Sequence, residues 1–254
     1  HVIRTHQSER GTNLSMALAR ALHWKKESAV PMAPQSWSCV VTNGFINDLA
    51  LIGRSRALFD DDLLEHGASL TEAVRGARFL VVGGAGSVGS AVVRELFARE
   101  PAALHVVDVA ESALAELVRD LRSSMGYIPG DFQTFCVDCG DPEFESLVRH
   151  EGPYDRVLFL AALKHVRSER DPYTLMRLLR VNVLDMLRTV DLVRHGGLRK
   201  FFWVSTDKAS RPINAMGASK ALVESLLPVR SQDLPVSKVR LANVAFSNGS
   251  LPAS

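Results

Sequence analysis

Residues 79–89 read Phe79-Leu80-Val81-Val82-Gly83-Gly84-Ala85-Gly86-Ser87-Val88-Gly89. The four apolar residues predict a buried strand. The glycines that follow match the G-x-G-x-x-G pattern, which joins a strand to a helix in dinucleotide-binding folds. Asp108 stands nineteen residues after Gly89, at the end of a second apolar run. We therefore expect a pyrophosphate to lie at the start of a helix, held by Gly83, Gly86, Ser87, Val88 and Gly89.

Short apolar runs alternate with helical patterns throughout the rest of the chain. The expected strands are 79–82, 104–107, 132–137, 156–160, 200–204 and 237–241. One expected helix follows the glycine loop and ends near 98, and the other main helices span 111–124, 173–194 and 218–230. Near-continuous apolar strands that alternate with helices are typical of a parallel sheet covered on both faces. We predict an α/β fold with a doubly wound, Rossmann-like parallel sheet.

The first 75 residues lack this alternation. Helical patterns at 15–24 and 43–65 flank a proline- and serine-rich stretch at 29–38. We divide the chain into a mostly helical N-terminal appendage, 1–75, and a NAD-binding Rossmann domain with a catalytic loop, 76–254. We expect the appendage to serve as an oligomer contact and the protein to be a homo-oligomer. Because the chain begins with histidine, we also expect it to be a fragment.

Composition limits the class of protein and its surroundings. The chain has 254 residues, is 46% hydrophobic and 23% charged, and carries a net charge of +2, so charge does not indicate a nucleic-acid partner. It has neither a signal-peptide pattern nor an apolar run of the roughly 20 residues that span a bilayer. Three cysteines indicate a reducing compartment, and we expect a cytoplasmic protein. We expect Cys136 and Cys139 to pack in or beside a strand rather than to bind a metal.

Acidic residues after the second and third strands bear on the cofactor. A carboxylate at Asp108 accepts hydrogen bonds from ribose hydroxyls and repels a 2′-phosphate, and Val109 and Ala110 supply no compensating cation. The sequence therefore favours NAD over NADP. Asp138 follows the third strand, where it either contacts the adenine amine or has only a structural role.

The segment after the fourth strand begins with Ala161 and Ala162, whose small side chains let the backbone pass close to a nicotinamide ribose. Lys164 and His165 follow, and they face either the substrate or solvent. Asn182 lies in a later helix between two valines. A buried amide needs hydrogen-bond partners, so we expect Asn182 to brace the backbone of the active site.

Thr206, Asp207 and Lys208 leave the fifth strand at the same edge of the sheet. A carboxyl there can protonate a leaving hydroxyl, and a partly desolvated lysine can remove a proton beside a carbonyl; the alternative is a surface ion pair. Met216 stands four residues before Lys220, where a Tyr-x-x-x-Lys dehydrogenase has tyrosine. We expect Lys220 to hold the nicotinamide ribose and Met216 to pack against the nicotinamide or the sugar.

These motifs together resemble the polysaccharide-biosynthesis branch of the nucleotide-sugar 4,6-dehydratases, in the extended short-chain dehydrogenase/reductase superfamily. The resemblance covers about 78–250, and it rests on the segments 83–89, 161–166, 205–209, 216–220, 240–244 and 247–250. The chain departs from the family pattern at Ala85, where threonine is commoner, and at Arg167, where proline is usual. The family continues past the end of this chain, so we expect the C-terminal substrate region to be largely absent.

The resemblance implies a lyase that acts on a UDP-N-acetylhexosamine, most often UDP-N-acetylglucosamine, in surface polysaccharide biosynthesis. Bound NAD takes hydride from C4 of the sugar, the C5 proton and the C6 hydroxyl leave as water, and hydride returns to C6. The family assigns the general acid to Asp207, the general base to Lys208 and a sugar contact to Thr206, and it places Asn243 among the substrate-binding residues. One branch carries methionine at the position of Met216.

Three questions stay open at this point. The base that deprotonates the C4 hydroxyl is Lys208, Lys220 or a relay through Thr206. The first alternative function is a NAD-dependent nucleotide-sugar 4-epimerase, although epimerases generally use the tyrosine that this chain lacks. The second is a truncated NAD-binding protein without activity.

Overall fold

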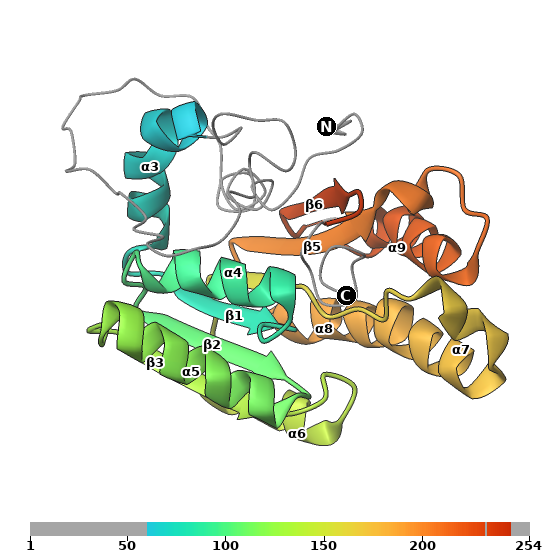
Figure 1. Cartoon of the computed structure of the whole chain (residues 1–254), viewed down its shortest axis with the longest axis horizontal. Helices are drawn as coiled ribbons and strands as arrows, with labels where there is room; N and C mark the ends of the chain where they lie inside the picture. The colour runs from blue at the N-terminus through green and yellow to red at the C-terminus, as the bar shows by residue number, and fades with distance from the viewer. Residues whose placement is uncertain (1–59, 232, 245–254) are drawn as a thin grey trace, which may run out of the picture.

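The computed structural model describes residues 60–231 and 233–244, which form one parallel sheet with helices on both faces (Figure 1). The strand order is β3-β2-β1-β4-β5-β6, and every neighbouring pair is parallel. The strands are β1 Arg78–Val82, β2 Ala103–Asp108, β3 Asp131–Cys136, β4 Arg156–Phe159, β5 Lys200–Thr206 and β6 Val236–Leu241. This order is that of a doubly wound dinucleotide fold, so the predicted fold class is confirmed.

Helices cover each face of the sheet through separate hydrophobic clusters. On one face lie α3 Asp60–Val74, α4 Ser87–Phe97 and α5 Glu111–Met125. On the other lie α6 Pro142–Glu151, α8 Met186–Val193 and α9 Ala215–Arg230. Alternate residues of β1 serve the two faces: Phe79 and Val81 join the first cluster, and Leu80 and Val82 join the second. A strand buried on both faces explains why this run is continuously apolar.

The helix expected over 173–194 contains an irregular turn. It consists of α7 Pro172–Leu179, the π-helical segment η2 Arg180–Asp185, and α8. The wider π turn surrounds the buried Asn182, and such turns are frequent at functional sites. The short 3₁₀ segments η1 Val166–Arg170 and η3 Asp207–Ala209 follow β4 and β5.

Two element boundaries near the catalytic loop differ from the prediction. β5 continues to Thr206 rather than ending at 204, because Ser205 and Thr206 pair with Arg240 and Leu241 of β6. α9 begins at Ala215 rather than 218, because the side chain of Asn214 accepts a hydrogen bond from the Gly217 amide, 2.8 Å away. Met216 therefore lies in the first turn of a helix.

Of the N-terminal appendage, only its last part lies within the described residues. The expected helix at 15–24 and most of the one at 43–65 fall outside them, and α3 runs to Val74. Leu70 and Val74 pack into the same hydrophobic cluster as β1 and α4. In the part of the chain that the structure describes, no helix is long and apolar enough to cross a membrane.

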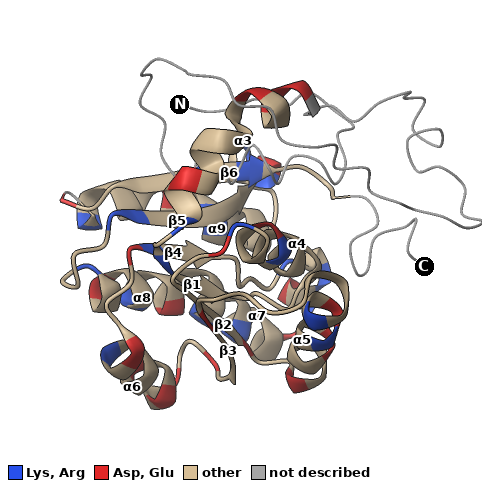
Figure 2. Cartoon of the chain, turned by 90° about the vertical axis from the view of Figure 1, so that its left-hand side faces the viewer, with Lys and Arg blue, Asp and Glu red and all other residues tan. Residues whose placement is uncertain are grey.

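Charged residues of both signs occur on the outer helices. α5 carries Glu111, Glu116, Arg119, Asp120 and Arg122, and Figure 2 shows acidic and basic positions side by side on this helix. This mixture agrees with a net charge of only +2. It gives α5 no basic face of the kind that binds nucleic acid.

The two cysteines of the C-x-x-C pattern pack as expected. Cys136 is the exposed last residue of β3, and its Sγ lies 3.7 Å from the Val109 carbonyl oxygen. Cys139 is buried in the second hydrophobic cluster, and burial raises the pKa of its thiol to about 12. At that pKa the thiol stays protonated and unreactive at neutral pH.

Candidate active site

The segments that the sequence singles out lie at one edge of the sheet. All six strands are parallel, so the segments that follow their carboxyl ends gather there. Ligands of doubly wound folds bind at this edge. The glycine loop 83–89 follows β1, Asp108 ends β2, and 161–165 follows β4; Thr206 to Lys208 leave β5, and Asn243 follows β6.

Two glycines allow the loop after β1 to pack tightly. Gly83 has φ of +81°, and a Cβ on it would lie 2.4 Å from the amide nitrogen of Ala161. A Cβ on Gly89 would lie 2.1 Å from the carbonyl oxygen of Gly83. Any side chain at either position would push the loop away from α4 or from the end of β4, so glycine is a steric requirement at both.

Gly86 is less crowded than Gly83, Gly84 and Gly89. Within the described residues, a Cβ there would meet only the Gly83 carbonyl oxygen, 3.9 Å away. Gly86 is also the N-cap of α4 and makes no side-chain cap, and Ser87 and Val88 begin the helix. The first amides of α4, which have no carbonyl partner within the helix, thus follow a residue without a side chain. The loop fits a dinucleotide pyrophosphate, which needs a close backbone approach and the positive end of a helix dipole.

The carboxylate of Asp108 lies against this loop. Its Oδ2 accepts a hydrogen bond from the Ala85 amide at 2.9 Å, and its Oδ1 accepts one from the Ala110 amide at 3.1 Å. Asp108 therefore both supports the loop and presents a carboxylate beside it. Its role toward an adenosine ribose remains a prediction.

Asp138 makes strong contacts within the protein. Its Oδ2 accepts a hydrogen bond from Arg177 at 2.6 Å, and its Oδ1 accepts one from the Gly140 amide at 3.0 Å. Burial raises the pKa of this carboxyl, but the bonds from Gly140 and Arg177 outweigh burial and bring the pKa below its ordinary value. These contacts favour the structural role for Asp138, and adenine binding by this residue remains a prediction.

Asn182 braces the loop after β4, as the sequence predicts. Its Oδ1 accepts from the Leu163 amide at 2.9 Å, and its Nδ2 donates to the Leu163 carbonyl at 3.0 Å and to Ser219 Oγ at 3.2 Å. Ser219 Oγ in turn donates to the Met216 carbonyl at 2.7 Å. One buried amide thus ties the loop to the first turn of α9.

The loop after β4 has a second tie to α9. The side chain of Glu169, in η1, accepts a hydrogen bond from the Ala215 amide at 2.7 Å. Lys164 and His165 lie in the stretch between Leu163 and η1, and both are exposed. Ala161 and Ala162 follow β4 after Leu160, and the backbone of Ala161 lies beside Gly83. Contact of these four residues with cofactor or substrate remains a prediction.

Thr206, Asp207 and Lys208 form one hydrogen-bonded group with Asn243. Asp207 Oδ1 accepts from Thr206 Oγ1 at 2.9 Å and from Lys208 Nζ at 3.2 Å. Lys208 Nζ also donates to Asn243 Oδ1 at 3.1 Å. The Asp207 side chain is 53% exposed and that of Lys208 33%. The accessible carboxylate of Asp207 therefore accepts a hydrogen bond from the accessible ammonium group of Lys208. Acid–base chemistry needs such a pair of groups within hydrogen-bond distance.

Asp207 is ionised in this arrangement. Burial raises the pKa of its carboxyl, but the hydrogen bonds from Thr206 and Lys208 and the charge of Lys208 bring the pKa below its ordinary value. A general acid must carry a proton. Asp207 can therefore act as one only after it receives a proton, and the side-chain donors in contact with it are Thr206 Oγ1 at 2.9 Å and Lys208 Nζ at 3.2 Å.

Met216 and Lys220 stand one turn apart on α9, and both are buried. The Nζ of Lys220 lies 5.5 Å from the centre of the Trp203 ring, a cation–π contact. Burial lowers the pKa of Lys220 to about 8. Met216 has no proton to exchange, so of the two residues at the Tyr-x-x-x-Lys positions Lys220 is the one that can take part in proton transfer.

Sequence reasoning missed Glu224, which lies one turn after Lys220. Its carboxylate accepts hydrogen bonds from Ser205 Oγ at 2.7 Å, Lys238 Nζ at 2.6 Å and Arg240 Nε at 2.8 Å. Burial raises the pKa of Glu224, but these donors outweigh it and lower the pKa to about 2. The only sequence signal was the spacing of four residues from Lys220, which places the two side chains on one helix face.

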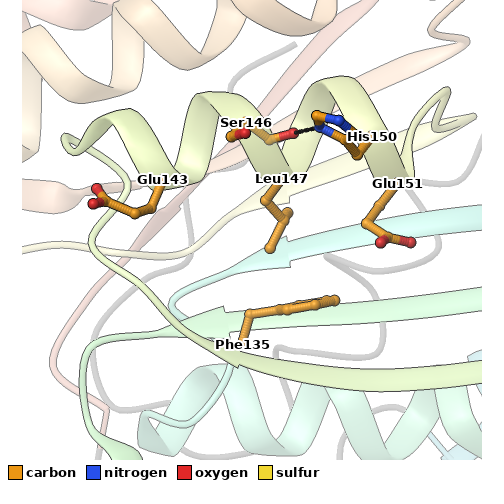
Figure 3. Close-up of a pocket in the computed structure, with 6 residues that line it drawn as sticks. All are labelled: Phe135, Glu143, Ser146, Leu147, His150 and Glu151. Carbon is orange, nitrogen blue, oxygen red and sulfur yellow. Dashed lines mark hydrogen bonds between the residues drawn. The ribbon is translucent and has the colours of Figure 1, made fainter.

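A separate hollow lies between α6 and the edge strand β3 (Figure 3). Its volume is about 330 Å³, and its lining residues are Phe135, Glu143, Ser146, Leu147, His150 and Glu151. His150 Nδ1 lies 2.8 Å from the Ser146 carbonyl oxygen. None of the candidate site residues lines this hollow.

The strand order and the glycine loop define the class of the protein as a Rossmann-like, doubly wound dinucleotide-binding fold. A solved structure of a UDP-Glc/GlcNAc 4-epimerase from Campylobacter jejuni superimposes with a TM-score of 0.56 at 20% identity, over 65% of this chain and 53% of that one. A likeness at this identity concerns the fold.

Residues 79–253 match the model of the polysaccharide biosynthesis protein family, and the chain belongs to that family. It is 34% identical, over 178 residues, to an uncharacterized membrane protein of Methanocaldococcus jannaschii, with 68% of this chain and 50% of that protein covered. It is 27% identical, over 183 residues, to the inverting UDP-N-acetylglucosamine 4,6-dehydratase of Campylobacter jejuni, with 69% and 52% covered. A UDP-glucose 4-epimerase of Rickettsia massiliae is 28% identical over 178 residues, with 68% and 50% covered. The chain thus spans about half the length of these three relatives.

Proposed function

We propose that this chain carries the cofactor-binding and acid–base part of a nucleotide-sugar 4,6-dehydratase in polysaccharide biosynthesis. The expected substrate is a UDP-N-acetylhexosamine, with UDP-N-acetylglucosamine first among candidates. The observation that carries the proposal is the hydrogen-bonded group of Thr206, Asp207 and Lys208 at the carboxyl end of β5. The named dehydratase among its relatives supports it.

NAD is the proposed cofactor, and when bound it supplies hydride acceptance at C4 of the sugar and hydride return at C6. The glycine loop would hold its pyrophosphate at the start of α4. Asp108 would bind the adenosine ribose, and Lys220 the nicotinamide ribose. Asp108 disfavours a 2′-phosphate, and the two residues that follow it carry no positive charge.

Lys208 and Asp207 would perform the elimination as a pair. Oxidation of C4 to a ketone releases the proton of the C4 hydroxyl to Asp207 and makes the C5 proton acidic, so that Lys208 in its amine form removes the C5 proton. Protonated Asp207, whose Oδ1 lies 3.2 Å from Lys208 Nζ, gives its proton to the C6 hydroxyl, which leaves as water. Lys208 returns its proton to C5 as hydride returns to C6. The proton from the C4 hydroxyl explains how a carboxyl with a lowered pKa serves as an acid.

Thr206 would orient the sugar hydroxyl at C4. Its Oγ1 donates to Asp207 Oδ1, so a proton taken from that hydroxyl can pass through Thr206 to the same carboxylate. Lys164, His165 and Asn243 are proposed to contact the nucleotide sugar. Met216 would form an apolar part of the pocket, since its thioether takes no part in proton transfer.

The alternative function is a nucleotide-sugar 4-epimerase. The epimerase among the relatives favours it. An epimerase oxidises C4 and returns hydride to C4, so it has no use for an acid that protonates a C6 hydroxyl. The adjacent Asp207 and Lys208 therefore favour the dehydratase.

Product mass distinguishes these functions. The purified protein is incubated with NAD and UDP-N-acetylglucosamine, and the products are followed by mass spectrometry. Loss of one water from the sugar nucleotide supports the dehydratase. An unchanged mass with inverted C4 stereochemistry would establish the epimerase instead, and NAD binding without turnover would indicate an inactive cofactor-binding protein.

Two variants test the assigned roles. Asp207→Asn should reduce dehydration roughly 100-fold or more, as expected for loss of a general acid, while the affinity for NAD stays nearly unchanged. Lys208→Ala should abolish exchange of the C5 proton with solvent deuterium. An equal loss of NAD affinity in Asp207→Asn would place Asp207 in the cofactor site, and undiminished exchange in Lys208→Ala would remove Lys208 as the base.

A further inference from the structure

The side chain of Glu224 joins the three elements that carry the proposed catalytic groups. Glu224 belongs to α9, one turn after Lys220. Its Oε1 accepts hydrogen bonds from Ser205 Oγ and Arg240 Nε, and its Oε2 accepts from Lys238 Nζ and Arg240 Nη2. One carboxylate therefore takes four hydrogen bonds from β5 and β6, and its side chain is only 8% exposed.

These partners stand next to the proposed catalytic residues in the chain. Ser205 directly precedes Thr206, and Arg240 lies three residues before Asn243. Ser205 and Arg240 are also register partners in the β5–β6 pairing. Glu224 thus clamps the carboxyl ends of two neighbouring strands and links both to the helix of Lys220.

The cost of burying charge argues that this arrangement does more than stabilise the fold. A buried carboxylate with two cations is often no more stabilising than apolar side chains of similar volume. The same network is well suited to fix geometry, because every member has a defined partner and direction. Within the described residues, Glu224 makes its hydrogen bonds to Ser205, Lys238 and Arg240 alone, and none of these is itself a proposed acid or base.

We propose that Glu224 is a positioning residue, which acts through Ser205 and Arg240 to hold the turn of Thr206, Asp207 and Lys208 in register with Lys220 and Asn243. The acid–base pair is thereby aligned with the sugar while the cofactor is held by the same helix. This inference rests on the proposed function, and it assigns a residue that supports the dehydration without touching the substrate.

Ser205→Ala is the mildest test, since it removes only the hydroxyl that joins the catalytic turn to Glu224. A displacement of about 1 Å can cost roughly 100-fold in rate. We expect kcat for dehydration of UDP-N-acetylglucosamine to fall roughly 10- to 100-fold, with KM and NAD affinity nearly unchanged. Ser225→Ala is the matched control, because among the residues that the structure describes the exposed Ser225 Oγ bonds only to the Ala221 carbonyl of its own helix, α9.

Glu224→Gln is the second variant, and Asp191→Asn is its control. Both substitutions neutralise a carboxylate that pairs with an arginine on another element: Glu224 pairs with Arg240, and Asp191 with Arg230. Glu224→Gln should lower kcat at least as much as Ser205→Ala, whereas Asp191→Asn should leave kcat within about twofold. Rates are taken per NAD-saturated molecule, well below the melting temperature of each variant.

The outcomes separate the inference from the proposed function. A wild-type enzyme that dehydrates the substrate, with both variants reduced in kcat and neither control affected, supports the positioning role. Variants that melt at lower temperature but keep the wild-type kcat overturn the role of Glu224 and leave the dehydratase standing. A wild-type protein that binds NAD without turnover overturns the proposed function, and this inference with it.

Discussion

Gly217 packs directly against the backbone of Lys208. A Cβ on Gly217 would lie 2.7 Å from the Lys208 carbonyl oxygen and 3.3 Å from the Lys208 Cβ. The first turn of α9 and the turn after β5 are therefore in contact through a position that admits no side chain. This contact holds Lys208 at a fixed place relative to Met216 and Lys220 on the same helix.

Gly217→Ala should shift the turn that carries Lys208. The clash is with backbone, which cannot rotate away as a side chain does, so we expect a destabilisation of about 1–3 kcal/mol and a roughly 10-fold or larger loss of kcat. Gly67→Ala is the matched control, because Gly67 also lies within a helix but has none of the described residues within 4 Å of its Cβ position. That control should gain up to about 1 kcal/mol. Equal effects of both substitutions on kcat would disprove the role of the contact.

Asn182→Leu should release the loop after β4. The substitution removes both hydrogen bonds to the Leu163 backbone and one to Ser219. The buried partners are left unsatisfied, so we expect a loss of about 2–4 kcal/mol in urea unfolding together with weaker NAD binding. Thr189→Val removes a buried hydroxyl from α8, the helix that continues from the π-helical segment of Asn182, and should leave NAD affinity unchanged. Unaltered NAD affinity in Asn182→Leu would show that the loop does not border the cofactor.

Lys220→Met should stabilise the protein without cofactor while damaging its function. Burial lowers the pKa of Lys220 to about 8, from an ordinary value of 10.5. The folded state therefore disfavours the ammonium form, a cost that is full below pH 8 and disappears as pH rises toward 10.5. At pH 7 the variant should gain up to about 3 kcal/mol, and its advantage should shrink between pH 8 and 10.5. NAD affinity should fall.

Thermal melting of the apoprotein across this pH range checks the sign for Lys220. Lys164→Met is the control, because Lys164 is exposed and its removal should give no comparable pH dependence. A Lys220→Met variant that is less stable than the wild type at pH 7 would mean that the buried ammonium is compensated by contacts stronger than the one with Trp203.

Asp108→Asn should weaken the preference for NAD over NADP. The amide keeps an oxygen that can accept the hydrogen bond from Ala85, but it no longer repels a 2′-phosphate. We expect the ratio of NAD to NADP affinity to fall roughly 5- to 10-fold at low salt. Fluorescence titration with both cofactors measures this ratio. Asp120→Asn, which neutralises an acid of α5 paired with Arg94, should leave this ratio unchanged. A fall of the ratio in both variants would mean that the loss of any negative charge, rather than the position of Asp108, changes the preference.

The sequence predicts the features whose signals are local. Apolar runs mark the inner strands β1, β2, β4 and β5, and the spacing of Gly83, Gly86 and Gly89 marks the turn into α4. The predicted bracing by Asn182 also follows from a local conflict, an amide between two valines. The network of Glu224 has no such signal, because its partners lie 14 to 19 residues away and meet only after β5 and β6 pair.

The end of β5 is a strand boundary that the sequence predicts too early, because it too depends on pairing between distant residues. Ser205 and Thr206 are polar, so the apolar run stops at Val204, yet both pair with β6 and extend the strand. Strand pairing adds backbone hydrogen bonds that no side-chain pattern records. α9 begins earlier than the sequence predicts for a comparable reason, because the cap of Asn214 and the contact with Glu169 depend on tertiary structure.

The prediction that the protein is a homo-oligomer can be tested by substitutions in α7, η2 and α9, which contact one another. Large apolar side chains are exposed there: Tyr173 80%, Met176 67%, Leu184 62%, Leu222 47% and Val229 70%. Exposed apolar side chains on neighbouring elements favour association with another copy, because association removes them from water. The double substitution Met176→Glu and Val229→Glu should therefore shift the protein toward monomer in sedimentation velocity. Leu64→Glu, at an 81% exposed leucine of α3, tests the N-terminal appendage, which the sequence predicts as the oligomer contact, and we expect it to leave the assembly intact. Dissociation by Leu64→Glu alone would move the interface to the other face of the sheet.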